Sequence, residues 1–379
     1  MLSRNRSSAP RRVVPPMAGE PGRRTFHTLD GLRGVAALAV VCFHYSTWIR
    51  PFALPSAYLA VDLFFLMSGV VVAYAYAGRL TGGLSPWRFG LIRWIRLFPL
   101  YLVGFCLGAA MTMAALLKGV AANWTWPDFT AAVAFGMWLL PAIAPTGRPH
   151  LYPLNPPVWS LFWELAINLA YAATVRWLTP RVLVLVAAPA ALGLVALGWR
   201  SGTLNLGYEW SGSAVAALRV LFSFTVGVFL ATLLRAGRLP RLRAPPTALL
   251  LLTAAALALP TTLGVLKDLA CVLLVFPLIC LAAIQNEPRR KCAYAFLGQI
   301  SYPVYVTHLA FPVFRTLDAV LHRPTASLAP WSGLLTIALI VVVGWGLARF
   351  VDPPLRRILT SLLADRPQRR ALGEIQPET

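Results

Sequence analysis

The stretch Leu29–Ile49, LDGLRGVAALAVVCFHYSTWI, decides the fold because it is apolar enough to enter a bilayer although it carries Arg33 and His44. These two residues are eleven positions apart. At about 100° per residue, eleven steps end about 20° beyond three full turns, so both side chains lie on one helix face, about 16 Å apart along the axis. Ionisable side chains inside a membrane are costly and face the interior of a bundle. We therefore predict a membrane helix whose polar face meets other helices.

The rest of the chain repeats this kind of apolar run from end to end. Of its 379 residues, 58% are hydrophobic and only 12% are charged. Runs of about 20 apolar residues match the thickness of the hydrocarbon core of a bilayer. The composition predicts an all-α, polytopic transmembrane helical bundle in the cell inner (cytoplasmic) membrane. We expect about ten spans, at residues 29–49, 57–78, 90–117, 157–178, 181–200, 213–235, 246–265, 268–286, 298–320 and 331–351.

The strongly basic charge is explained by topology rather than by a nucleic-acid partner. The formal net charge is +21, and most of the basic residues lie in short loops between apolar runs. Nucleic-acid binding would need these charges clustered on one surface, whereas loop arginines set the orientation of membrane helices. The five cysteines show no metal-ligand spacing, so they are interpreted as small buried hydrophobic residues and no metal site is predicted.

The apolar piece Phe129–Ile143 decides between ten and eleven spans. If this piece does not cross, the N-terminal arginines and the basic clusters at 235–243, 289–291 and 356–357 share one side of the membrane. If it crosses, the cluster at 235–243 moves to the other side. The positive-inside rule therefore favours ten spans with both termini in the cytoplasm. The opposite side then holds few basic residues: Arg50, Lys118, Arg148, Arg200, Lys267, and Arg315 or Arg323.

The two ends of the chain are polar and are expected to carry no further folded domain. Residues 1–28 are rich in Arg and Pro, which is typical of a disordered segment. We expect a disordered cytoplasmic N-terminus at 1–28, a membrane domain at 29–357 and a cytoplasmic tail at 358–379.

Four other segments keep polar groups at membrane depth. They are AVDLFFLMSG, RWIRLFPLY, NPPVWSLFWELAINLAY and GQISYPVYVTHLAF. Intramembrane ionisable residues mark functional sites by default. The candidate site residues that these segments add are Asp62, Arg93, Arg96, Trp159, Ser160, Glu164, Tyr302 and His308.

Each of these residues also has a structural explanation. Arg93 and Arg96 can be positive-inside anchors near a helix end. A histidine within the membrane can simply hydrogen-bond between helices. Asp62 and Glu164 can be buried partners of arginines. No single motif decides between a functional and a structural role.

The motifs taken together, in their order, resemble the acyltransferase-3 family of polytopic membrane acyltransferases. The ordered set is LDGLRG with the Arg-x10-His spacing, VDLFFLMSG, Arg-x-x-Arg before FPLY, WSLFWE and ISYPVYVTH. The resemblance covers about residues 25–357, nearly the whole chain. It implies an O-acyltransferase that modifies extracytoplasmic sugars, polysaccharides and related acceptors. It also implies acyl-CoA, with acetyl-CoA as the default, as co-substrate and no permanently bound cofactor.

Acyl transfer to a hydroxyl gives each candidate residue an expected role. An alcohol needs a general base, and His44 is suited to that task. Arg33, Arg93 and Arg96 are suited to binding the phosphates of acyl-CoA. Glu164 and Ser160 are expected to be catalytic, and a polar cavity is expected to be completed by Asp62, Trp159, Tyr302 and His308.

A second class of function stays open at this point. Many spans with buried charges also describe a transporter or flippase for a glycan or another polar substrate. We find no inverted repeat in the sequence that would favour it. The sequence also leaves open the acceptor, the acyl chain length, and whether transfer is direct or passes through a covalent intermediate.

Overall fold

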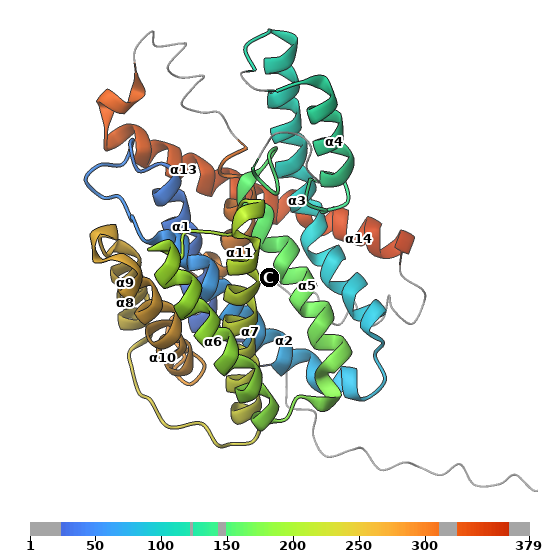
Figure 1. Cartoon of the computed structure of the whole chain (residues 1–379), viewed down its shortest axis with the longest axis vertical. Coiled ribbons are helices and arrows are strands. Elements are labelled where there is room, and N and C mark those ends of the chain that lie inside the picture. Colours follow the sequence, from blue (N-terminus) through green and yellow to red (C-terminus); the bar gives the residue numbers. More distant parts are fainter. Residues whose placement is uncertain (1–23, 122–123, 143–148, 311–323, 364–379) are drawn as a thin grey trace, which may run out of the picture.

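The helices of the computed structural model pack into one bundle (Figure 1). The structure describes residues 24–121, 124–142, 149–310 and 324–363. Within these ranges there is no β-strand beyond an isolated bridge between His150 and Glu209. The α-helices are α1 (His27–His44), α2 (Ala60–Thr81), α3 (Pro86–Leu117), α4 (Trp126–Gly136), α5 (Trp159–Thr174), α6 (Pro180–Ser201), α7 (Ser213–Arg235), α8 (Pro246–Ala258), α9 (Gly264–Ala270), α10 (Phe276–Ala283), α11 (Cys292–Thr307), α13 (Trp331–Gly346) and α14 (Asp352–Leu363).

Helix starts follow local capping chemistry. Ser85 and Thr179 stand immediately before Pro86 and Pro180, the first residues of α3 and α6. Each hydroxyl accepts a hydrogen bond from the backbone N–H three residues later, at 3.3 Å. Ser and Thr at the cap position satisfy an otherwise unpaired N–H group, and Pro at the first helical position fits because it has no N–H to satisfy. These short signals fix where two of the long helices begin.

Seven helical segments of the described residues are long and apolar enough to cross a membrane. They correspond to seven of the ten expected spans, so the polytopic all-α architecture is confirmed and the count of ten stays a prediction. The expected span at 298–320 lies partly outside the described residues, and α1 has 18 residues, about 27 Å of helix. The seven segments are Ala57–Thr81, Pro86–Leu117, Pro156–Trp177, Pro180–Ser201, Trp210–Arg235, Thr261–Ala283 and Trp331–Leu363.

Several boundaries differ from the sequence expectation, and the first helix ends at His44 rather than at Ile49. The helix expected at 246–265 ends at Ala258, and a new helical segment begins at Thr261. Leu259 is extended, with φ −56° and ψ 138°, because the residue before a proline is disfavoured in the helical region. The expected tail at 358–379 begins as helix, since α14 continues to Leu363.

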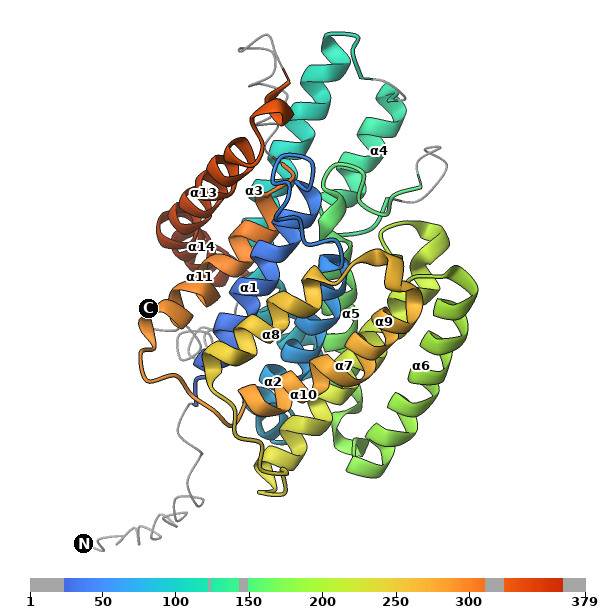
Figure 2. The ribbon, with the colours of Figure 1, turned by 90° about the vertical axis from the view of Figure 1, so that its left-hand side faces the viewer.

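Residues Phe129–Gly136 of the piece Phe129–Ile143 form most of a short helix, and Ile143 lies outside the described residues. This helix, α4, has 11 residues, about 16 Å, which is half the thickness of a hydrocarbon core. Figure 2 shows α4 beside the end of α3 that lies farthest from the loop at 236–245. With 32 residues, about 48 Å, α3 is longer than a bilayer core is thick, and α4 packs against it.

Two pairs of helices build the centre of the bundle. Helix α1 packs on α11, and α2 packs on α7. In the first pair, a Cβ at Gly34 would collide with Leu297 of α11. In the second pair, Gly69 and Gly227 face each other, and a Cβ at either would collide with the partner's backbone. Small residues allow such close approach of membrane helices, and here they fix the register of both pairs.

Candidate functional site

The register of α1 and α11 brings two histidines into contact. His44 is the last residue of α1, and His308 follows the last residue of α11. Nδ1 of His44 lies 3.0 Å from Nε2 of His308, although the residues are 264 positions apart in sequence. His308 is fully buried, while His44 is exposed. The expected polar face of α1 therefore meets a polar partner at its His44 end.

The contacts of the two rings define their protonation pattern. Nδ1 of His308 lies 2.8 Å from the carbonyl oxygen of Tyr305, which can only accept, so this nitrogen carries a proton. In a neutral ring, Nε2 of His308 is then an acceptor. Nδ1 of His44 faces that acceptor and also the carbonyl of Val40 at 3.0 Å, so it must donate. This leaves the lone pair of His44 Nε2 without a hydrogen bond among the described residues, as a general base requires.

Ser160 forms no hydrogen bond to a base among the residues that the structure describes. Its Oγ is 2.8 Å from the hydroxyl of Tyr305, which donates to the carbonyl of Pro157 at 2.9 Å. A serine nucleophile needs a base within hydrogen-bonding reach, and neither a histidine nor a carboxylate contacts Ser160 among the described residues. The arrangement makes Ser160 a hydrogen-bonding group rather than an activated nucleophile.

Glu164, one turn further along α5, is held by two donors. Nη2 of Arg93 donates to Glu164 Oε1 at 2.8 Å, and the hydroxyl of Ser68 donates to the same oxygen at 3.0 Å. Arg93 is 3% exposed, so it is a buried ion-pair partner and not an interfacial anchor. Nε of Arg93 is buried without a partner in the described residues. One donor of this guanidinium is therefore left unsatisfied inside the protein.

Arg33 and Arg96 lie toward the other end of the polar face, where they and Arg93 form what we call the arginine cluster. Arg33 is 3.9 Å from Asp30, a long contact between two partly exposed groups. Arg96 interacts electrostatically with Arg33, Arg93 and Asp30, but it makes no ion pair within the described residues. Next to it in sequence, the carbonyl of Leu97 accepts a hydrogen bond from the hydroxyl of Tyr302. The cluster thus offers a guanidinium free to bind an anion.

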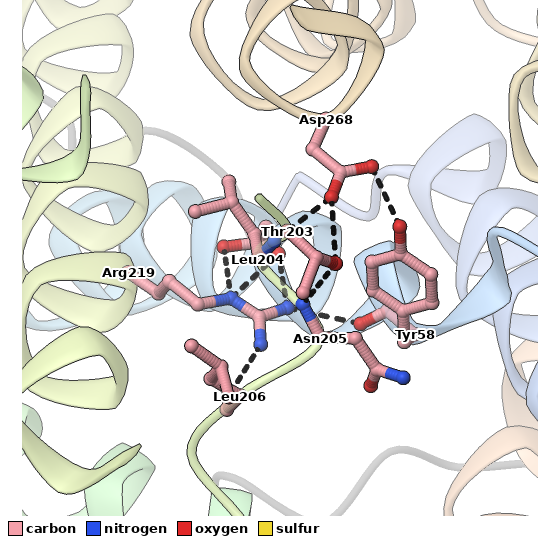
Figure 3. A network of polar contacts seen from close by, with 8 residues as sticks. Tyr58, Thr203, Leu204, Asn205, Leu206, Arg219 and Asp268 are labelled. Carbon is pink, nitrogen blue, oxygen red and sulfur yellow. Dashed lines mark hydrogen bonds and ion pairs between the residues drawn. The ribbon is translucent and has the colours of Figure 1, made fainter. Parts of the chain in front are cut away.

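Asp62 belongs to a separate, fully buried network. It forms an ion pair with Arg219 of α7, and each side chain is 1% exposed. Nε of Arg219 lies 3.1 Å from both carboxylate oxygens, Nη1 donates to the carbonyl of Leu206 at 2.8 Å, and Nη2 donates to that of Tyr58 at 2.9 Å (Figure 3). Every nitrogen of this guanidinium is used, which is what a buried charge needs. The ion pair of Asp62 with Arg219 therefore links α2 to α7.

Sequence reasoning did not find Arg219, which stands alone in the apolar run of α7. The signal available was Asp62 itself, because an isolated acid at membrane depth needs a cation nearby. Trp159, which was expected to help complete the polar cavity, is 6% exposed, and Arg219 lies 5.8 Å from the centre of its ring. Its ring is thus packed inside this network.

Two further charges complete the same network. Nζ of Lys267 lies 2.9 Å from Asp268 Oδ1, which also accepts a hydrogen bond from the hydroxyl of Tyr58 at 2.7 Å. The other oxygen of Asp268 accepts from the backbone N–H of Leu204 at 2.8 Å (Figure 3). Lys267 is 7% exposed and is a buried ion-pair partner, and its expected side of the membrane stays a prediction. Tyr58 joins the two ion pairs, since its carbonyl binds Arg219 and its hydroxyl binds Asp268.

Comparison with known proteins gives the family. Residues 26–349 match the family described as an acyltransferase domain, acyltransferase-3. The chain belongs to the acyltransferase-3 family. It is 37% identical over 188 residues to "Protein 2 in picA locus" of Rhizobium radiobacter, covering 47% of this chain and 97% of that protein. It is 25% identical over 369 residues to "Acyltransferase MdmB" of Streptomyces mycarofaciens, covering 88% of this chain and 92% of that protein. No solved structure matches the chain.

Family and fold together establish a membrane acyltransferase of the acyltransferase-3 family. This result sets aside the transporter alternative as the primary activity. The structure adds a histidine pair at one end of the polar face of α1 and the arginine cluster at the other. Since α1 is continuous between Arg33 and His44, the two ends are about 16 Å apart.

Proposed function

We propose that this acyltransferase moves an acyl group, acetyl in the simplest case, from acyl-CoA to a hydroxyl of an extracytoplasmic carbohydrate or glycosylated acceptor. The observation that carries this proposal is the pairing of His44 with His308, which leaves one nitrogen of His44 as a free base. An alcohol is a poor nucleophile until a base takes its proton. The acceptor class is inferred from the side of the membrane on which we place His44.

The donor is inferred from the arginine cluster. Guanidinium groups bind phosphates through paired, charge-assisted hydrogen bonds, and acyl-CoA carries its phosphates at the end opposite the thioester. Phosphates held near Arg96 and Arg33 let the long pantetheine arm extend along α1 toward His44. The base and the phosphate-binding groups then lie at opposite ends of one extended donor.

The chemical step follows from these positions. Nε2 of His44 accepts the proton of the acceptor hydroxyl while the oxygen attacks the thioester carbon. The tetrahedral intermediate expels the CoA thiolate, which takes the proton back from His44, so the products are an ester and CoA. His308 positions the base by holding the proton of His44 on Nδ1. No oxidant, metal or further reactant is needed for this balance.

Ser160 and Glu164 receive supporting roles in this scheme. Because Ser160 contacts Tyr305 and no base, we assign it to orienting the bound groups, and transfer is direct. Glu164 accepts hydrogen bonds from Arg93 and Ser68, so we assign it to holding Arg93 in place. Both assignments predict that alanine variants slow the reaction without removing it.

The orientation in the membrane is testable by labelling, and it is part of the proposal. We place the basic loop at 236–245 in the cytoplasm and α4 outside, since the positive-inside rule favours this arrangement. In a chain without native cysteines, Val120→Cys should react with an impermeant thiol reagent in intact cells. Gly237→Cys should react only after the membrane is permeabilised. External labelling of Gly237→Cys in intact cells would contradict the orientation that we propose. Gly147, another candidate position for external labelling, lies outside the described residues.

The proposed reaction is tested by following both products. Cells with the wild-type chain or with His44→Ala are grown on isotopically labelled acetate, and their envelope glycans and secreted glycosylated metabolites are compared by mass spectrometry. We expect a labelled, alkali-labile acetyl ester only with the wild-type chain. In reconstituted vesicles, acetyl-CoA should release free CoA when these glycans are present. A wild-type chain that releases no CoA and adds no ester would contradict the proposal.

A further inference from the structure

The last helix of the described residues, α14, packs against α3 beside the arginine cluster. Figure 1 shows α14 next to the middle of α3. Asp352, Arg356 and Leu359 lie on its inward side, where Asp352 is 9% exposed and Leu359 contacts the core. Arg357, Ile358 and Leu362 are exposed on the other side. This amphipathic arrangement directs one arginine of the pair Arg356–Arg357 toward the protein.

Arg356 is held in a fixed orientation. Its Nε donates to Asp352 Oδ1 at 2.8 Å, and its Nη2 lies 2.6 Å from Oδ2 of the same carboxylate. This two-point contact fixes the plane of the guanidinium, and Nη1 makes no hydrogen bond within the described residues. Arg356 also interacts electrostatically with Arg96 and with Tyr302, whose hydroxyl binds the carbonyl of Leu97 on α3. The fixed guanidinium therefore belongs to the surroundings of the arginine cluster.

The charge balance of this region is positive. Four guanidinium groups, those of Arg33, Arg93, Arg96 and Arg356, stand against three carboxylates, Asp30, Glu164 and Asp352. Arg96 interacts repulsively with each of the other three arginines. Like charges that lie close together at a partly buried site repel one another, and a bound anion lowers this repulsion.

We propose that Arg356, placed by Asp352, is a further donor-binding residue that contacts a phosphate of acyl-CoA together with Arg96. This inference rests on the proposed function and deepens it, because it makes α14 part of the donor site. Positive-inside anchoring alone does not explain why Arg356 is turned inward and clamped while Arg357 beside it is exposed. A helix-stabilising ion pair four residues apart is the competing explanation, and it predicts no effect on donor affinity.

The test compares Arg356→Gln with Arg357→Gln in reconstituted membranes. Glutamine at 356 keeps a hydrogen-bond donor for Asp352 and removes the charge, so α14 stays in place. The donors are acetyl-CoA and S-acetylpantetheine, which lacks the nucleotide and its phosphates. We expect the KM for acetyl-CoA to rise about 10- to 100-fold in Arg356→Gln, as for the loss of a charged hydrogen bond worth about 1.5–3 kcal/mol. The KM for S-acetylpantetheine should not change, and Arg357→Gln should match the wild type with both donors.

A binding measurement keeps the test independent of turnover. CoA should raise the melting temperature of the wild type and of Arg357→Gln, and it should raise that of Arg356→Gln much less. An unchanged KM for acetyl-CoA, an equal rise for both donors, or equal stabilisation of all three proteins by CoA would overturn the role of Arg356. Failure of the wild type to bind CoA or use acetyl-CoA would instead overturn the proposed function. The two failures are therefore distinguishable.

Discussion

His44→Ala is expected to lower the rate of acyl transfer by about 10²–10⁴-fold, the usual contribution of a general base. The reason is geometric: His44 Nε2 is the unpaired basic nitrogen of the histidine pair, and nothing in the contacts of Ser160 or Glu164 replaces it. His44 ends a helix and is exposed, so truncation should leave expression and folding close to normal. Turnover of acetyl-CoA in vesicles, with melting temperature as the folding measurement, checks both parts.

Variants of two other histidines sharpen the result. His150→Ala is the matched control, because His150 lies beside Tyr208, away from the histidine pair, and should leave the rate unchanged. His308→Gln keeps an acceptor for the proton on His44 Nδ1 and should retain more activity than His308→Leu, which removes that acceptor. A purely structural His308 would give two equally impaired proteins. If His44→Ala retains the wild-type rate of acyl transfer, His44 is not the general base.

The sequence was sufficient to predict which helix faces are polar, but not which residues they meet. The Arg-x10-His spacing correctly placed Arg33 and His44 on one face of a continuous helix, because spacing within one helix is fixed by 3.6 residues per turn. The contact of His44 with His308 depends on the register of α1 against α11. That register is set by a close approach at Gly34, which no periodicity within either helix reveals.

The partners of buried charged residues were the second feature that could not be predicted from the sequence. Arg93 was assigned either to the donor or to the membrane interface, and the structure shows it bound to Glu164 inside the protein. Arg219 was missed because a lone arginine in an apolar helix carries no spacing signal of its own. Asp62 required a cation at similar depth, but choosing among helices needs the knowledge that α2 packs on α7. The helix break before Pro260 was also missed, although a proline disfavours the helical conformation of the residue before it.

Asp62→Leu is expected to destabilise the folded protein by about 3–5 kcal/mol, as when one partner of a buried ion pair is removed. Arg219 is 1% exposed and would keep its charge, because a guanidinium does not lose its proton in proteins. Arg219→Met should be less damaging, since the stranded carboxylate of Asp62 can take up a proton and become neutral. Thermal unfolding in detergent, followed for both single variants, measures this order.

The double variant Asp62→Leu/Arg219→Met tests whether the ion pair itself is needed for stability. Replacing a buried pair by apolar side chains of similar volume is often neutral, so the double variant should recover most of the stability lost in Asp62→Leu. The two residues are in direct contact, so their effects should be strongly non-additive. Lys118→Met, on an exposed turn, controls for loss of a basic residue. Additive losses in the double variant, or single variants as stable as the wild type, would show that this network does not hold α2 against α7. Because Arg219 also lies over the ring of Trp159 at the start of α5, restored stability with lost acyl transfer would assign the network to positioning the site.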